Sequence, residues 1–145
     1  MAAYIIMLVM LAYESVIDIR ERKIDIRAVL AAGITSMLVG VIFYERPVIF
    51  ILYGIILGGV LLIIARISRQ RIGYGDAIIF MVLGMCLEPV RVIGILWVSM
   101  LMAGVYGMIK IILFNKDRNL ALPFIPFVTI VFSGMFILNV INGGI

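Results

Sequence analysis

Histidine is absent from this chain of 145 residues, and cysteine occurs once. Without histidine there can be no HExxH zinc site, no Ser-His or Cys-His nucleophile pair and no imidazole metal ligand. The single cysteine, Cys86, falls in an apolar stretch, which excludes an internal disulfide and a thiolate metal cluster and predicts a buried, inert thiol. We therefore expect no metal or other cofactor, and any catalysis must rely on carboxylates.

Charge is also scarce. Charged residues make up 14% of the chain and hydrophobic residues 66%, with a mean hydropathy of +1.30, whereas soluble domains are only about half apolar. This composition excludes a water-soluble fold and predicts an all-α integral membrane protein embedded in the lipid bilayer. In a membrane protein, a formal net charge of +4 reflects the basic residues that set its orientation in the bilayer. We therefore expect no nucleic-acid partner.

Six apolar segments predict about six transmembrane helices in a single domain, residues 1–145. Most of them approach the roughly 20 residues that span a bilayer, but the fourth has about half that length unless residues 72–76 also lie in the membrane. The first segment lacks a basic region and a cleavage site and is expected to be a retained helix. The segments are residues 2–17, 28–44, 48–65, 77–87, 90–114 and 120–141.

The basic residues predict the orientation of these helices. Ten of the twelve fall in or near the first, third and fifth connections, and only Arg46 and Arg91 fall on the other side. Because cytoplasmic loops carry the excess of lysine and arginine, we expect the odd-numbered connections in the cytoplasm and both termini outside. Gly54 and Gly58 form a GxxxG pair that predicts close helix packing within the bundle.

Asp76 follows Gly73, Tyr74 and Gly75 and immediately precedes the fourth apolar segment. An aspartate in mid-membrane costs about 2.5 to 3.5 kcal/mol, and less near the interface, so its presence indicates a partner or a function. The glycines permit close approach and unusual dihedral angles where a helix begins. The alternative is that Asp76 is an ordinary N-cap of the following helix.

Asp18 ends the first apolar segment, where the helix dipole disfavours an acid, so capping does not explain it. The alternative here is a solvated loop charge paired with Arg22. The predicted topology brings Asp18 and Asp76 to the same membrane face. If the two carboxylates lie close together, they share a proton, so that one activates water while the other protonates the scissile carbonyl, as in aspartic proteases.

Three motifs resemble those of the type IV prepilin peptidases. The segment DIRERKID, residues 18–25, resembles the first-aspartate segment of that family, although it lacks a proline between Ile24 and Asp25. GYGD, residues 73–76, matches the GxGD signature, although Ala77 and Ile78 follow where many relatives have a lysine. LPFIPF, residues 122–127, resembles a Pro-Phe-x-Pro-Phe element near the start of a late helix.

The resemblance implies a GxGD aspartic protease-like bundle in which Asp18 and Asp76 are the catalytic pair, supported by Gly73, Tyr74 and Gly75. It implies a peptidase of the cytoplasmic (inner) membrane that cuts the basic leader of type IV prepilins or secretion pseudopilins on the cytoplasmic side. The chain begins directly with its first helix, whereas larger relatives carry an N-terminal region associated with methylation. We therefore expect a minimal form without N-methyltransferase activity.

The remaining polar candidates each have two interpretations. Glu14, one turn before Asp18, either tunes the acidity of the pair or is a structural hydrogen-bond partner. Glu21 and Asp25 either receive the basic leader or form solvated ion pairs with neighbouring basic residues. Tyr74 either contacts substrate or anchors the chain at the interface. Pro123 and Pro126 are expected to start or kink the last helix near the site.

Two other functions compete with proteolysis. Intramembrane carboxylates also form ion relays, which would suit a small ion-coupled transporter. The same fold could also serve as a non-catalytic assembly subunit. Two aspartates far apart, with no cleft that admits a peptide, would favour these alternatives.

Overall fold

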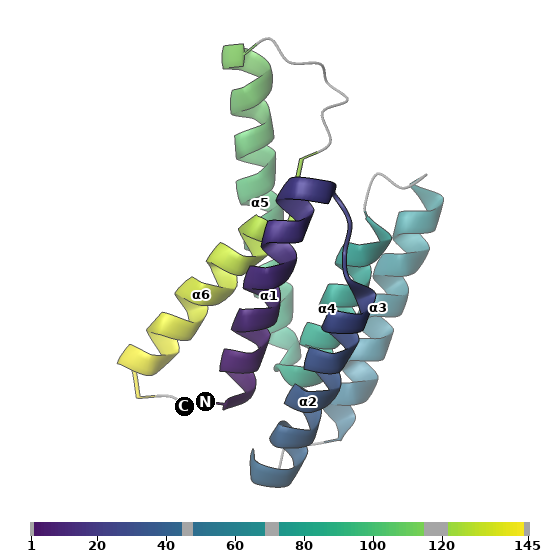
Figure 1. Ribbon diagram of the computed structural model, residues 1–145, viewed down its shortest axis with the longest axis vertical. Helices are drawn as coiled ribbons and strands as arrows, with labels where there is room; N and C mark the ends of the chain where they lie inside the picture. Colours follow the sequence, from purple (N-terminus) through teal and green to yellow (C-terminus); the bar gives the residue numbers. More distant parts are fainter. Residues whose placement is uncertain (1, 45–47, 69–72, 115–121, 144–145) are drawn as a thin grey trace.

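The computed structural model describes residues 2–44, 48–68, 73–114 and 122–143, which form six helices and no strand. Successive helices run in opposite directions, so α1, α3 and α5 end on one side of the molecule and α2, α4 and α6 end on the other (Figure 1). The helices are α1 (Ala2–Glu21), α2 (Ile26–Tyr44), α3 (Ile49–Ile67), α4 (Tyr74–Cys86), α5 (Pro89–Phe114) and α6 (Ile125–Ile141).

Each predicted apolar segment forms a helix, which confirms the all-helical class. The largest differences from the predicted bounds are that α1 continues past Asp18 to Glu21 and that α6 begins only at Ile125, two residues after Pro123; the other boundaries differ by up to three residues. Among the described residues, α1, α2, α3 and α5 are long and apolar enough to cross a membrane. The helices α4 and α6 are shorter, with 13 and 17 residues. The structure thus supports a multi-pass membrane protein with two shorter helices.

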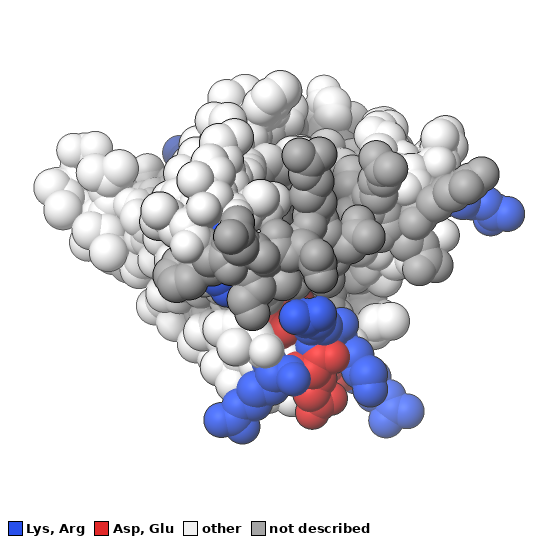
Figure 2. Space-filling view, turned by 90° about the horizontal axis from the view of Figure 1, so that it is seen from above, with Lys and Arg blue, Asp and Glu red and all other residues white. Residues whose placement is uncertain are grey.

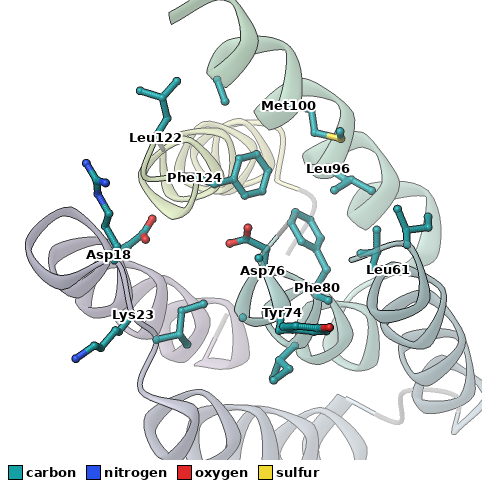
Figure 3. A pocket seen from close by; sticks show the side chains of 18 of the residues that line it. Asp18, Lys23, Leu61, Tyr74, Asp76, Phe80, Leu96, Met100, Leu122 and Phe124 are labelled. Carbon is teal, nitrogen blue, oxygen red and sulfur yellow. The ribbon is translucent and has the colours of Figure 1, made fainter. Parts of the chain in front are cut away.

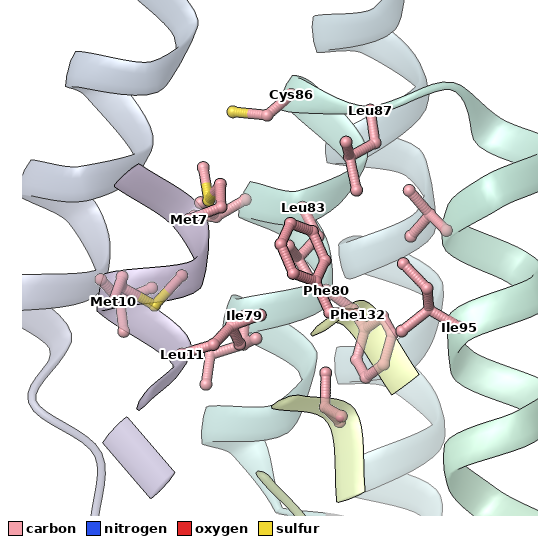
Figure 4. Close-up of a cluster of buried hydrophobic side chains, with 14 of the residues drawn as sticks. Met7, Met10, Leu11, Ile79, Phe80, Leu83, Cys86, Leu87, Ile95 and Phe132 are labelled. Carbon is pink, nitrogen blue, oxygen red and sulfur yellow. The ribbon is translucent and has the colours of Figure 1, made fainter. Parts of the chain in front are cut away.

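The short helix α4 packs against α2, α3 and α5. More than half of its residues are buried, among them Ile79, Phe80 and Leu83. These side chains meet Leu11 of α1 and Phe132 of α6 in the hydrophobic core (Figure 4). Neighbouring helices therefore cover much of α4, the short fourth helix that the sequence predicts.

Glycines bring α3 and α4 into close contact, as the GxxxG pair predicts. A Cβ atom on Gly54 would lie 2.7 Å from the carbonyl carbon of Gly84 and would collide with the amide of Met85. A Cβ atom on Gly58 would collide with Met81. The backbones of the two helices therefore touch where no side chain separates them.

Charged side chains gather at the end of the bundle where α1, α3 and α5 finish. Seen from this end, the acidic groups and several basic groups cluster at one edge, and a further basic group stands apart at the right (Figure 2). At the opposite end Arg91 forms an ion pair of 3.1 Å with Glu88. The described basic residues at the first end are Arg20, Arg22, Lys23, Arg27, Arg66 and Lys110. Arg46, Arg69, Arg71, Lys116 and Arg118 lie outside the described residues.

The contact between α3 and α4 predicts opposite effects for two glycines of α3. Gly54→Ala should lower the free energy of unfolding by about 1 to 3 kcal/mol, because the added methyl group meets backbone atoms that cannot move aside. Gly59→Ala should be neutral or stabilising by up to about 1 kcal/mol, because its Cβ meets nothing within 4 Å and alanine favours helix. Unfolding in mixed detergent micelles measures both, and equal losses would contradict this packing.

Candidate active site

Asp76 lies in the first turn of α4. The N-cap of this helix is Gly73, with φ −67° and ψ 136°, and no side chain caps it. The interpretation of Asp76 as a plain N-cap is therefore wrong. Its carboxylate instead turns back toward Gly73, where a Cβ atom would lie 3.0 Å from Oδ2. The acid is held close to the point where α4 begins.

The two glycines of GYGD do not adopt unusual dihedral angles. The backbone of Gly73 is extended and Gly75 is helical; in the described residues the only glycine with positive φ is Gly143. Close approach, the other reason for glycine, does apply: a Cβ atom on Gly75 would collide with Ile24, in the connection between α1 and α2. Gly75 thus allows the start of α4 to rest on the chain that follows Asp18.

Asp18 lies within the last turns of α1 and is half-buried. Its Oδ2 accepts a hydrogen bond of 3.1 Å from the amide of Ile125, the first residue of α6. The structure records no ion pair between Asp18 and Arg22 in the described part of the chain, although the two charges attract each other. The interpretation of Asp18 as a solvated loop charge is therefore wrong.

Asp18 and Asp76 line the same cavity, which has a volume of about 1150 Å³ and which we call the aspartate cavity. Their carboxylates point toward each other across it (Figure 3). Phe124, just before α6, and Phe80 of α4 pack beside the acids with ring centroids 6.2 Å apart. The other walls are mainly apolar and include Leu61, Ile64, Leu96, Trp97 and Met100 from α3 and α5. The arrangement can hold an extended peptide beside two carboxylates.

Glu14 is completely buried and does not line the aspartate cavity. Its Oε2 accepts a hydrogen bond of 3.0 Å from the amide of Asp25, while Oε1 has no partner among the described residues. Asp25 in turn caps α2, since its Oδ1 accepts the amides of Arg27 at 3.0 Å and Ala28 at 3.4 Å. The contacts of Glu14 are those of a structural partner that holds the connection between α1 and α2.

The other predicted residues divide between this cavity and its surroundings. Gly73, Tyr74 and Gly75 line the aspartate cavity. Glu21 is exposed and lies outside it. The ion pairs expected for Glu21 and Asp25 are not found within the described part of the chain. Pro126 is at the start of α6, as predicted, but Pro123 and Pro126 line a different cleft.

Sequence reasoning missed residues that complete the site. These are the amide of Ile125, the ring of Phe124 and the side chain of Ile24. All three lie in the predicted motifs, next to the charged residues and prolines that were the candidates. The apolar walls from α3 and α5 carry no motif. Their side chains resemble those that face lipid, so no signal in the sequence marks them.

The family model described as the type IV leader peptidase family matches residues 5–108, which is more than half of the chain. The chain therefore belongs to the type IV leader peptidase family, as its motifs predict, and is a peptidase. The matched region contains both Asp18 and Asp76 and ends before the LPFIPF segment. No curated protein and no solved structure gives a significant match.

The contact between Gly75 and Ile24 predicts an energetic coupling. Gly75→Ala should destabilise the protein by about 1 to 3 kcal/mol, because the Ile24 side chain must move away from the core that it packs against. The same change made in an Ile24→Ala background should cost much less. Thermal unfolding of the unaltered protein, Gly75→Ala, Ile24→Ala and the double variant measures this difference.

Gly94→Ala on α5 is the matched control, because its Cβ atom meets nothing within 4 Å. It should leave the unfolding midpoint close to that of the unaltered protein. If Gly75→Ala costs the same with and without Ile24, the two residues are not coupled and the contact is wrong.

Proposed function

We propose that this member of the type IV leader peptidase family is a membrane-embedded aspartic endopeptidase that cleaves the basic leader of a type IV prepilin or pseudopilin. The observation that carries the proposal is the pair of carboxylates, Asp18 and Asp76, facing each other in one cavity (Figure 3). Asp18 lies on α1 and Asp76 lies on α4, and the two motifs that contain them are far apart in the sequence.

The two carboxylates share one proton in the working enzyme, because like charges in a poorly solvated site do not both ionise readily. The ionised carboxylate takes a proton from a water molecule, which attacks the scissile carbonyl carbon. The protonated carboxylate donates its proton to the carbonyl oxygen, which gives a tetrahedral intermediate. When this intermediate collapses, the C–N bond breaks and the carboxyl group that took its proton from water passes that proton to the leaving amine. The other carboxylate regains a proton from the hydroxyl group of the intermediate. The chemistry requires no covalent enzyme intermediate.

The shape and charge of the aspartate cavity suggest how a substrate lies. Its apolar walls, which include Leu61 and Leu96, suit an apolar segment of the substrate. Arg22 and Lys23 also line the cavity, and they repel the basic leader. We therefore place the leader outside, where the exposed Glu21 can contact it, and the apolar segment inside.

The charge distribution supports a cytoplasmic site in the inner membrane. The aspartates lie near the end of the bundle where α1 finishes, and six of the seven described basic residues lie at this end. Because basic residues favour the cytoplasmic side, this end faces the cytoplasm and both termini lie outside.

The ion-coupled transporter receives less support. A path for ions requires polar groups through the depth of the membrane. Among the described acids Glu14 is deeper than Asp18, but its Oε2 is occupied by the amide of Asp25 and it does not line the aspartate cavity. Two acids in one cavity that admits a peptide fit a protease better than a relay or a non-catalytic subunit.

Substitution of either aspartate tests the proposal. Asp18→Asn and Asp76→Asn should each lower the rate of cleavage by about 100- to 10,000-fold, because asparagine can neither accept nor donate the transferred proton. The assay is mass spectrometry of a peptide with a basic leader followed by an apolar segment, incubated with the protein in liposomes. Glu88→Gln, at the opposite end of the bundle, should retain activity. Normal cleavage by either asparagine variant would refute the assignment.

The shared proton also predicts a bell-shaped dependence of cleavage rate on pH. At low pH both carboxylates are protonated and no base remains to activate water. At high pH both are ionised and no acid remains to protonate the carbonyl oxygen. A rate that rises with pH to a plateau, measured on the same peptide, would indicate a single catalytic carboxylate.

A further inference from the structure

A second cleft, of about 480 Å³, opens beside the aspartate cavity. Its lining residues come from the end of α1, the last part of α5 and the start of α6 with the residues just before it, and we call it the basic cleft. Arg22 and Lys110 both line it, and none of its lining residues is acidic. Neither cation forms an ion pair within the described ranges. Within the described part of the chain, the residues that line this concave site thus include two cations and no acid.

Aromatic rings form one wall of the basic cleft. The Nζ atom of Lys110 lies 5.0 Å from the ring centre of Tyr106. Tyr106 in turn packs against Phe127 of α6, with ring centroids 5.5 Å apart. Tyrosine is typical of the level where hydrocarbon meets the polar headgroups. The wall therefore provides an apolar surface next to two cations.

The position of Arg22 is built into the backbone. Its φ angle is 54°, the only positive value for a non-glycine residue among those described, and its amide donates to the carbonyl of Asp18 at 3.1 Å. A non-glycine residue adopts this left-handed conformation at a cost, and it persists where the surrounding structure requires it. The turn places Arg22 between the two cavities, both of which it lines.

The basic cleft lies at the end of α1, next to exposed apolar residues of that helix. Ile19, which also lines it, has 60% of its side chain exposed on the apolar exterior of α1. The cleft therefore borders lipid on one side and the charged end of the bundle on the other. A basic leader would be repelled by Arg22 and Lys110, so the cleft does not suit the substrate of the aspartate cavity.

We propose that the basic cleft binds the headgroup of an anionic phospholipid. Arg22 and Lys110 pair with the phosphate oxygens, while Tyr106 and Phe127 contact the glycerol and the upper part of the acyl chains. Arginine and lysine between membrane helices at a cytoplasmic interface form sites of this kind, and charge-assisted bonds to phosphate are strong. The proposal does not depend on proteolysis.

Native mass spectrometry tests the proposal with the full chain reconstituted in phosphatidylcholine and phosphatidylglycerol and then released into detergent. The unaltered protein should retain phosphatidylglycerol in preference to phosphatidylcholine. Arg22→Gln/Lys110→Gln should reduce the retained phosphatidylglycerol by about tenfold or more, as expected for the loss of two charge-assisted contacts. Unchanged retention by this variant would overturn the proposal.

Arg27→Gln/Arg66→Gln is the matched control, because it removes the same charge at the same end of the bundle from residues outside the basic cleft. It should retain phosphatidylglycerol as the unaltered protein does. An equal loss in both double variants would mean that lipid responds to overall charge and not to a site. Inorganic phosphate is the second arm: if millimolar phosphate displaces the lipid, the cleft is a site for soluble phosphate and the lipid assignment fails.

A reporter that keeps both cations provides a separate measurement. Trp97 is the only tryptophan, so Trp97→Phe/Tyr106→Trp moves the single indole to the basic cleft. Brominated phosphatidylglycerol should quench its fluorescence more than brominated phosphatidylcholine does at the same mole fraction. The unaltered protein, with its indole at position 97 outside the basic cleft, should show no such difference. Equal quenching by the two lipids at position 106 would also overturn the proposal.

Discussion

The amide of Ile125 at the start of α6 donates a hydrogen bond of 3.1 Å to Asp18 on α1, and the aspartate cavity depends on this contact between residues 107 positions apart. The first amides of a helix have no partner within the helix, and an unpaired amide is costly near the hydrocarbon. Asp18 supplies such a partner. The same contact places Phe124 over Phe80, which closes one wall of the cavity. The carboxylate of Asp18 thus stabilises the start of α6 and also lines the aspartate cavity.

Close packing around α4 determines where the second carboxylate lies. Gly54 and Gly84 let α3 touch α4 along the backbone, and Gly75 lets the start of α4 rest on Ile24. A larger side chain at Gly54 or Gly84 would push α3 and α4 apart, and one at Gly75 would displace Ile24 from the start of α4. Three glycines, of which only Gly75 belongs to GYGD, therefore help to set the position of Asp76.

The four acids in and around the first connection have different roles because their surroundings differ. Glu14 is fully buried and holds the amide of Asp25; Asp25 caps α2; Glu21 is exposed to solvent. Asp18 faces a cavity. All four lie within twelve residues, so their order in the chain does not distinguish them. Glu14, Asp18 and Glu21 differ in the face of α1 that each occupies and in what packs against that face, whereas Asp25 lies beyond α1, just before α2.

Composition and the length of the apolar segments were enough to predict a helical membrane protein, since a segment of about 20 apolar residues can satisfy its backbone hydrogen bonds within the bilayer as a helix. The sequence also singled out Asp18 and Asp76 as candidates. Each is an acid at the end of an apolar segment, where charge is rare, and each lies in a motif that resembles one of the family. Only the tertiary structure decided that the two carboxylates line one cavity, that Gly73 and not Asp76 is the N-cap residue of α4, and that Glu14 accepts the amide of Asp25. Contacts such as Gly75 with Ile24, or Asp18 with Ile125, join distant segments through shape and backbone groups, and neither leaves a periodic pattern in a single sequence.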